Sequence, residues 1–278
     1  LMSQPMASAG HLDVVRLTSR LISPPRGWTS VQVHDELAST NALAMQRGHP
    51  WEVLVAEHQG AGRGRLDRSW EAPAGTSLTF SATVPPPQEA PGWVPLVAGL
   101  AVAEAIHATT GLDATLKWPN DVLLPADGLR KVCGILCEYR PPSGLTPPLV
   151  VVGIGLNVTQ ARAQLPVDTA TSLALAGAEA VDREDLLVTV LDRFATRYAA
   201  LLAGGPAADG VRAAYRDACL TLGTQVRLER PGGVATTALA LDVDAEGVLV
   251  VDEGSGPTRY AAGDVTHLRP AAVGDGLA

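Results

Sequence analysis

The sequence of 278 residues is long enough for two domains and a sizeable hydrophobic core. Hydrophobic residues make up 46% and charged residues 18%, a balance that excludes a mainly disordered chain. The 29 acidic residues outnumber the 21 basic ones, and the formal charge of −8 argues against a nucleic acid or an anionic membrane as the main partner.

The cysteine content and the N-terminus indicate a cytoplasmic protein. The three cysteines, Cys133, Cys137 and Cys219, form no CxxC pair and no even-numbered disulfide set, so we interpret them as packing residues. The first residues lack the basic and apolar regions of a signal peptide, and the longest apolar helix candidate, 95–106, is interrupted by Glu104. We therefore expect no membrane span.

The first regular elements begin near residue 30. Residues 1–27 are rich in Ser, Pro and Gly and are predicted to be a flexible lead-in rather than a domain. Alternating residues predict a strand from Ser30, and residues 39–41 offer an N-cap to a short helix that ends at Gly48.

Strands and helices then follow without strict alternation. Further strands are expected at 52–57, 77–84, 114–118, 121–124, 132–139 and 149–158. Helices are expected at about 95–110, 183–202 and 211–220, the second with Asp182 as its cap. This order favours an α+β fold over a doubly wound sheet. From Leu222 onward, short strands at about ten-residue spacing predict a small antiparallel barrel.

A glycine- and arginine-rich segment occupies residues 57–70. Its alternate glycines are Gly60, Gly62 and Gly64, and its arginines are Arg63, Arg65 and Arg68. Ordering a dozen such residues costs on the order of 10 kcal/mol, which contacts with a ligand would offset. Forked guanidinium groups suit carboxylate and phosphate oxygens. We therefore expect this loop to fold over an anionic ligand and to be mobile without it. The alternative is a solvated surface loop. Trp70 is interpreted as a purine-stacking platform or a core residue.

Polar residues at the ends of three apolar strands form a second group. Lys117, Asn120 and Asp121 surround Pro119, a pattern that fits an ordinary turn or a functional one. Lys131 stands at the mouth of the buried strand 132–139. The other 19 of the 21 basic residues are arginines, so the two lysines hint that a compact ammonium is needed.

Asn157 ends the apolar strand 149–158, and its buried amide must bond either to the backbone or to a bound base. His34, His58 and His107 form no HExxH pattern, so no dedicated metal cage is expected.

The motifs follow one another in a specific order: residues 39–41, Gln59 with GRGR and Trp70, KWPND, the strand from Lys131 to Glu138, and the Gly-Leu-Asn ending at Asn157. In this order they resemble the biotin protein ligases. The resemblance covers about residues 30–270. It implies a mixed-sheet catalytic domain of the biotin/lipoate ligase type at 28–220, a C-terminal SH3-like barrel at 221–270, and a tail at 271–278. It also implies ATP-dependent activation of biotin to biotinyl-5′-AMP, with Mg²⁺ carried by the nucleotide, and transfer to a lysine of a biotin carboxyl carrier domain of acyl-CoA carboxylases.

The resemblance assigns site residues position by position. For biotin it implies Ser39, Thr40, Asn41, Gln59, Gly62, Arg63, Gly64, Arg65, Lys131 and Gly134. For ATP it implies Arg63, Arg65, Trp70, Lys117, Asn120 and Asn157. The implied catalytic residues are Lys131, Asp121 and Arg65.

Three other functions compete with this interpretation. A lipoate ligase or octanoyltransferase would share the architecture, but GRGR and KWPND favour biotin. A biotin-responsive repressor is disfavoured because fewer than 40 residues precede Ser39, too few for a helix-turn-helix domain, and because the charge is acidic. A non-catalytic biotin-binding module is disfavoured by Lys131 and Asp121. We expect a monomer or a weak homodimer, without nucleic acid or membrane partners.

Overall fold

The computed structural model describes residues 11–22, 27–65, 69–229, 235–260 and 264–267. A seven-stranded sheet forms the centre of the larger part, in the order β1-β2-β5-β9-β8-β7-β6. The strands are β1 Ser30–Leu37, β2 Glu52–Gln59, β5 Ser77–Val84, β9 Leu149–Asn157, β8 Arg130–Arg140, β7 Asp121–Leu124 and β6 Thr115–Lys117. Because β1 and β2 pair in parallel and the other neighbours are antiparallel, the sheet is mixed, which confirms the predicted fold class.

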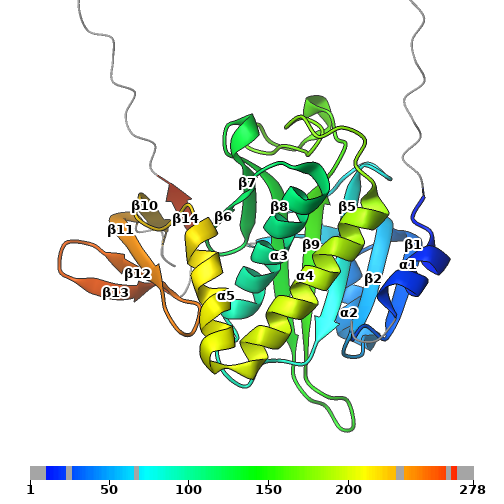
Figure 1. Ribbon diagram of the computed structural model, residues 1–278, viewed down its shortest axis with the longest axis horizontal. Coiled ribbons are helices and arrows are strands. Elements are labelled where there is room, and N and C mark those ends of the chain that lie inside the picture. Colours follow the sequence, from blue (N-terminus) through cyan, green and yellow to red (C-terminus); the bar gives the residue numbers. More distant parts are fainter. Residues whose placement is uncertain (1–10, 23–26, 66–68, 230–234, 261–263, 268–278) are drawn as a thin grey trace, which may run out of the picture.

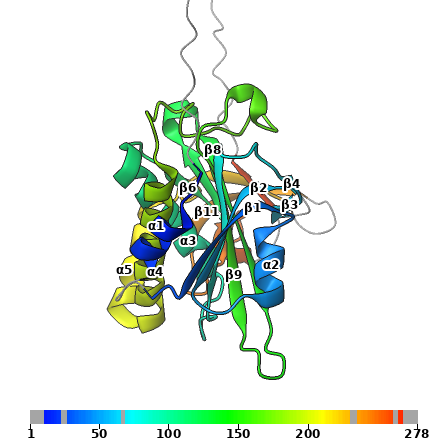
Figure 2. The same cartoon turned by 90° about the vertical axis from the view of Figure 1, so that its right-hand side faces the viewer.

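The helices divide unequally between the two faces of this sheet, as Figure 2 shows with the sheet seen edge-on. The helices α1 Val14–Leu21, α3 Trp93–Thr110, α4 Arg183–Ala203 and α5 Gly205–Ala218 lie on one side, and α2 Thr40–Arg47 lies on the other. Leu78 and Phe80 of β5 belong to the main hydrophobic core with α3 and α4, whereas Leu54 and Val151 pack with Ala44 of α2.

The face that carries α2 is unusually polar for a buried surface. Along β5 the side chains alternate between apolar residues and hydroxyl residues, yet all eight are buried. The hydroxyl set is Ser77, Thr79, Ser81 and Thr83. Since buried hydroxyls need hydrogen-bond partners, this face is the one that can accommodate polar ligand groups.

Most predicted helix boundaries are confirmed. Ser39 caps α2 by accepting a hydrogen bond from Ala42 N–H, and Asp182 caps α4 by accepting from Glu184 and Asp185 N–H. In contrast, α5 starts at Gly205, not at 211, because Pro206 occupies the first turn, where its missing N–H costs no intrahelical bond.

Among the described residues, α3 alone is long and apolar enough to cross a membrane, yet 67% of it is buried within the fold. The helix is therefore part of the protein core.

The predicted flexible lead-in at 1–27 is wrong for its described part. Helix α1 packs on β1 and α4, with Leu12 and Leu17 at most 2% exposed. The backbone N–H of Leu12 donates to the buried Glu57 Oε1 at 2.7 Å. Burial of these apolar side chains, rather than local composition, orders the segment.

The C-terminal part is an antiparallel sheet in the order β13-β12-β11-β10-β14, beside β6 and α5 (Figure 1). Its strands are β10 Gln225–Glu229, β11 Ala235–Val243, β12 Leu249–Asp252, β13 Pro257–Tyr260 and β14 Asp264–His267. Two tryptophans of the larger part attach to it: Trp93 Nε1 donates to Asp244 O at 3.0 Å, and Trp118 Nε1 donates to Gly247 O at 3.2 Å.

Candidate active site

Three glycines form the floor of the candidate site on the polar face of the sheet. Gly134 of β8 pairs with Gly155 of β9, and Gly153 lies two residues before Gly155 in the same strand. A Cβ on Gly155 would come within 2.2 Å of the Trp70 ring, and one on Gly153 within 2.2 Å of Asn41 Oδ1. A side chain at Gly153 or Gly155 would displace these groups, so both positions require glycine.

The resemblance named Gly134, but sequence reasoning missed Gly153 and Gly155. Their signal in the sequence is a pair of glycines at alternate positions within an apolar strand. Such glycines often mark a close approach of another group to the backbone.

The N-terminus of α2 and the end of β2 bring four predicted biotin contacts together. The backbone N–H and the hydroxyl of Thr40 lie 2.9 and 3.2 Å from Gln59 Oε1. The Ser81 hydroxyl lies 2.6 Å from Asn41 Oδ1 and 2.8 Å from Thr40 Oγ1. These side chains are buried and mutually hydrogen-bonded, and the buried Ser39 hydroxyl accepts from Ala42 N–H, so their orientations are fixed before any ligand binds.

Glu138 connects this group to the arginine-rich loop. Asn41 Nδ2 donates to Glu138 Oε2 at 2.8 Å, and Arg63 Nη2 lies 3.3 Å from Glu138 Oε1. Glu138 ends the strand motif that begins at Lys131, but the sequence analysis assigned it no role. The feature that could have identified it is an acidic residue inside a buried strand. Its carboxylate therefore links Asn41 to Arg63.

The loop itself begins with a short hairpin, β3 Gly62–Arg63 and β4 Ser69–Trp70. A Cβ on Gly62 would lie 2.1 Å from Gln59 Nε2, so glycine is required for the hairpin to close. Gly64, a predicted biotin contact, follows β3. The next residue, Arg65, donates from Nη1 to Asn120 Oδ1 at 3.3 Å. Arg68 lies outside the described residues, and the expected mobility of the loop stays a prediction.

Lys131 and Asp121 form an ion pair at one end of the floor. Lys131 Nζ lies 2.7 Å from Asp121 Oδ1 and 5.8 Å from the centroid of a Trp70 ring. The two side chains are 31% and 21% exposed, so a ligand can reach both. Within the described part of the chain, the buried Trp70 Nε1 has no hydrogen-bond partner. The Trp70 ring, the Lys131 ammonium and the Asp121 carboxylate thus lie next to one another.

The remaining predicted nucleotide contacts lie near this ion pair. Asn120 Nδ2 donates to Ile135 O at 2.8 Å, and Asn157 Nδ2 donates to Thr171 O at 2.9 Å. Lys117 and Asp121 pair across β6 and β7, and Asn120 lies in the turn that joins these strands. The amide of Asn157 therefore bonds to the backbone, which was the alternative left open by the sequence.

The cysteines are packing residues, as predicted. Cys133 and Cys219 are buried and Cys137 is half-buried, all with free thiols. Burial raises the pKa of the Cys133 thiol far above its usual value and that of Cys137 to about 12, which disfavours the nucleophilic thiolate. In the described segments, no three His, Cys, Asp or Glu side chains are placed to hold a metal ion together.

Comparisons with known proteins agree with this arrangement. Residues 35–157 match the Biotin/lipoate A/B protein ligase family, and residues 221–268 match the Biotin protein ligase C terminal domain. The biotin–[acetyl-CoA-carboxylase] ligase of Mycobacterium tuberculosis is 38% identical over 93% of this chain and 96% of its own length. The bifunctional ligase/repressor BirA of Bacillus subtilis is 31% identical over 84% of this chain and 72% of its own length.

Among solved structures, the biotin protein ligase from Aquifex aeolicus in complex with biotin and ATP superposes with a TM-score of 0.72. It is 27% identical, and the match covers 87% of this chain and all of that one.

Proposed function

The chain belongs to the biotin protein ligase family, and we propose that it activates biotin with ATP to biotinyl-5′-AMP and transfers the biotinyl group to a lysine of a biotin carboxyl carrier domain. The relative from Mycobacterium tuberculosis, named as a biotin–[acetyl-CoA-carboxylase] ligase, supports an acyl-CoA carboxylase as the source of the carrier. The observation that carries the proposal is the Lys131–Asp121 ion pair beside Trp70 on the glycine floor.

Activation requires the biotin carboxylate to attack the α-phosphate of ATP. Two unit charges of like sign 4 Å apart repel by about 4 kcal/mol at an effective dielectric constant near 20. Arg63, Arg65 and Lys131 place three cations around the glycine floor, and they offset this repulsion in the transition state. Mg²⁺ enters as part of the MgATP substrate.

Transfer requires the carrier lysine to attack the acyl carbon of biotinyl-5′-AMP while AMP departs. A lysine ammonium has an unperturbed pKa of about 10.4, so its proton must leave before the amine can attack. Asp121 stands at the reacting end of the floor, where its carboxylate orients the amine or accepts this proton.

The loop that begins at Gly60 excludes water from the mixed anhydride between the two steps. Residues 66–68 lie outside the described part, and ordering of the loop by biotin and ATP is part of this proposal. The close packing at Gly62 supports this ordering, because the absence of a side chain there lets the hairpin pack against Gln59.

We also propose the cellular setting and the domain division implied by the resemblance. The enzyme acts in the cytoplasm as a monomer or weak homodimer, without nucleic acid. Residues 28–220 form the catalytic domain, and residues 221–270 form an SH3-like barrel, for which the antiparallel order of β10 to β14 is the support.

Biotin-dependent exchange of pyrophosphate into ATP tests the first half-reaction, and ATP-dependent labelling of a carrier domain tests the second. We expect both with biotin, and no labelling of a carrier whose acceptor lysine is replaced by arginine. Exchange with lipoate but not with biotin would instead support a lipoate ligase, a reaction that the family name also covers. Absence of both reactions would contradict the proposal.

A further inference from the structure

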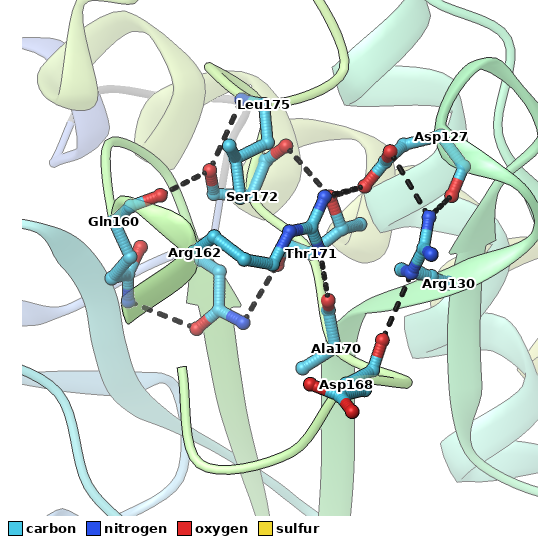
Figure 3. Close-up of polar contacts among 10 residues, drawn as sticks. Asp127, Arg130, Gln160, Arg162, Asp168, Ala170, Thr171, Ser172 and Leu175 are labelled. Atoms are coloured by element: carbon cyan, nitrogen blue, oxygen red, sulfur yellow. Dashed lines mark hydrogen bonds and ion pairs between the residues drawn. The ribbon is translucent and has the colours of Figure 1, made fainter. Parts of the chain in front are cut away.

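A cluster of polar contacts joins Asp127 to the loop that follows β9 (Figure 3). The Asp127 carboxylate accepts hydrogen bonds from Arg162 Nη2 at 2.6 Å, from Thr171 Oγ1 at 2.6 Å and from Arg130 Nη1 at 3.2 Å. Arg130 Nε also donates to Asp168 O at 2.9 Å. These donors hold the pKa of the Asp127 carboxyl below its usual value, the bond from Arg162 contributing most. None of these residues belongs to the site described above.

Thr171 also forms hydrogen bonds with two site residues, Lys131 and Asn157. Its hydroxyl donates to Asp127, its backbone N–H donates to Lys131 O at 2.8 Å, and its carbonyl accepts from Asn157 Nδ2 at 2.9 Å. Thr171 is fully buried, so it has no room to move independently of these partners. One residue therefore couples the start of β8, the end of β9 and the Asp127 cluster.

The backbone of Lys131 depends on the same loop. Lys131 N–H donates to Thr169 O at 2.8 Å, and Lys131 O accepts from Thr171 N–H at 2.8 Å. Both main-chain groups of Lys131 are thus bonded to the 169–171 segment, which lies parallel to β8 at Ala170. A shift of this segment would move the lysine that the reaction uses.

Asn157 is fixed from two sides by the loop. Gln160 Nε2 donates to Asn157 Oδ1 at 3.0 Å, while Asn157 Nδ2 donates to Thr171 O. Gln160 is itself held, because its carbonyl accepts from Ser172 Oγ at 2.7 Å. The amide that is expected on the adenine side is therefore oriented by residues that the Asp127 cluster anchors.

We propose that Asp127 is a positioning residue for adenylate formation: by holding Thr171 with Arg162, it sets the positions of Lys131, the expected catalytic lysine, and of Asn157, an expected nucleotide contact. The inference rests on the proposed function. A displacement of about 1 Å can cost on the order of 100-fold in rate, so a polar anchor outside the site can control the reaction. The hydrogen bonds between Thr40 and Gln59 join α2 to β2 and involve no residue of the Asp127 cluster.

The variants Asp127→Asn and Thr171→Val test the proposal. In biotin-dependent pyrophosphate exchange we expect each to raise the KM for MgATP by about tenfold and the KM for biotin by less, because the loop bonds the side chain of Asn157 but only the main chain of Lys131. Thr171→Ser keeps the hydroxyl and should restore the MgATP KM to near the wild-type value. The matched control is Asp209→Asn, which removes another aspartate paired with an arginine, Arg212, on α5.

The outcomes separate this inference from the proposed function. If wild-type protein catalyses no biotin-dependent exchange, the proposed function is wrong and this inference is overturned with it. If wild type is active but the variants only lose thermal stability, with both KM values unchanged, Asp127 is purely structural and the inference alone is overturned. Should Asp127→Asn fail to fold, the comparison of Thr171→Val with Thr171→Ser decides: equal MgATP KM values overturn the inference, and a value raised only in the valine variant supports it.

Discussion

Lys131 Nζ lies 2.7 Å from Asp121 Oδ1, across the neighbouring strands β8 and β7. The register of these strands shifts between Val122 and Leu123, which brings an ammonium and a carboxylate to the same edge of the glycine floor. In the proposed mechanism the two opposite charges serve different steps: the cation stabilises oxyanions, and the carboxylate orients or deprotonates the attacking amine. Substitution of each partner should therefore slow different half-reactions.

The variant Asp121→Asn should slow the transfer of the biotinyl group to the carrier more than it slows adenylate formation. An amide cannot accept the proton of the attacking lysine, and a positioned general base contributes about 100- to 10,000-fold. We expect single-turnover transfer from preformed biotinyl-5′-AMP to fall by about 100-fold. Wild-type rates in both half-reactions would exclude this role of Asp121. The exposed Asp113, replaced by Asn, serves as the control.

The variant Lys131→Gln should show the opposite pattern. Without the ammonium beside Trp70, the repulsion between the biotin carboxylate and the α-phosphate is no longer offset at that point. We expect biotin-dependent pyrophosphate exchange to fall by at least about 100-fold, as for the loss of an oxyanion-stabilising donor. Exposed Arg47 at the end of α2, replaced by Gln, removes one positive charge elsewhere and should leave exchange unchanged. Unchanged exchange in Lys131→Gln would assign the ion pair a structural role only.

The parts of the fold that could be predicted from the sequence are those fixed by local chemistry. Ser39 and Asp182 are short polar side chains that satisfy free N–H groups at helix starts, and this requires no knowledge of the rest of the chain. The alternation along 77–84 likewise fixes which side chains share a face. Helix α1 was missed because its order comes from packing on β1 and α4, which no local pattern reveals.

The candidate site was predictable as a set of residues but not as a geometry. The order of the motifs identified Lys131 and Asn157, whereas their connection through Thr171 depends on a loop that folds back onto β8. The contact between Gly155 and Trp70 depends on the register of β8 with β9 and on the hairpin that ends at β4. Such relationships join residues that are distant in the sequence, so periodicity and spacing carry no information about them.

The variant Gly155→Ala should weaken nucleotide binding and stability together. Its methyl group would lie 2.2 Å from the Trp70 ring, and overpacking of this kind costs about 1–3 kcal/mol. We expect a lower melting temperature and a raised KM for MgATP in pyrophosphate exchange. The matched control is Gly210→Ala in α5, where the added Cβ meets nothing within 4 Å and alanine should stabilise the helix by about 0.5–1 kcal/mol. Normal stability and KM in Gly155→Ala would show that Trp70 does not need this floor.

The stability contributed by Asp127 should disappear in acid. Hydrogen bonds from Arg162 and Thr171 hold the pKa of its carboxyl below the usual 3.8. A group with a lowered pKa in the folded state contributes stability above its unfolded-state pKa, and this contribution is lost as the pH falls through the folded-state value. Thermal unfolding followed by circular dichroism should therefore show Asp127→Asn less stable than wild type near pH 7, with the gap between them narrowing below about pH 4. In the Thr171→Val background, where one of the two bonds is missing and the folded-state pKa is lowered less, the gap should be smaller near pH 7 and should finish closing at a higher pH. A gap that is constant or widens in acid would contradict the ion-paired state of Asp127.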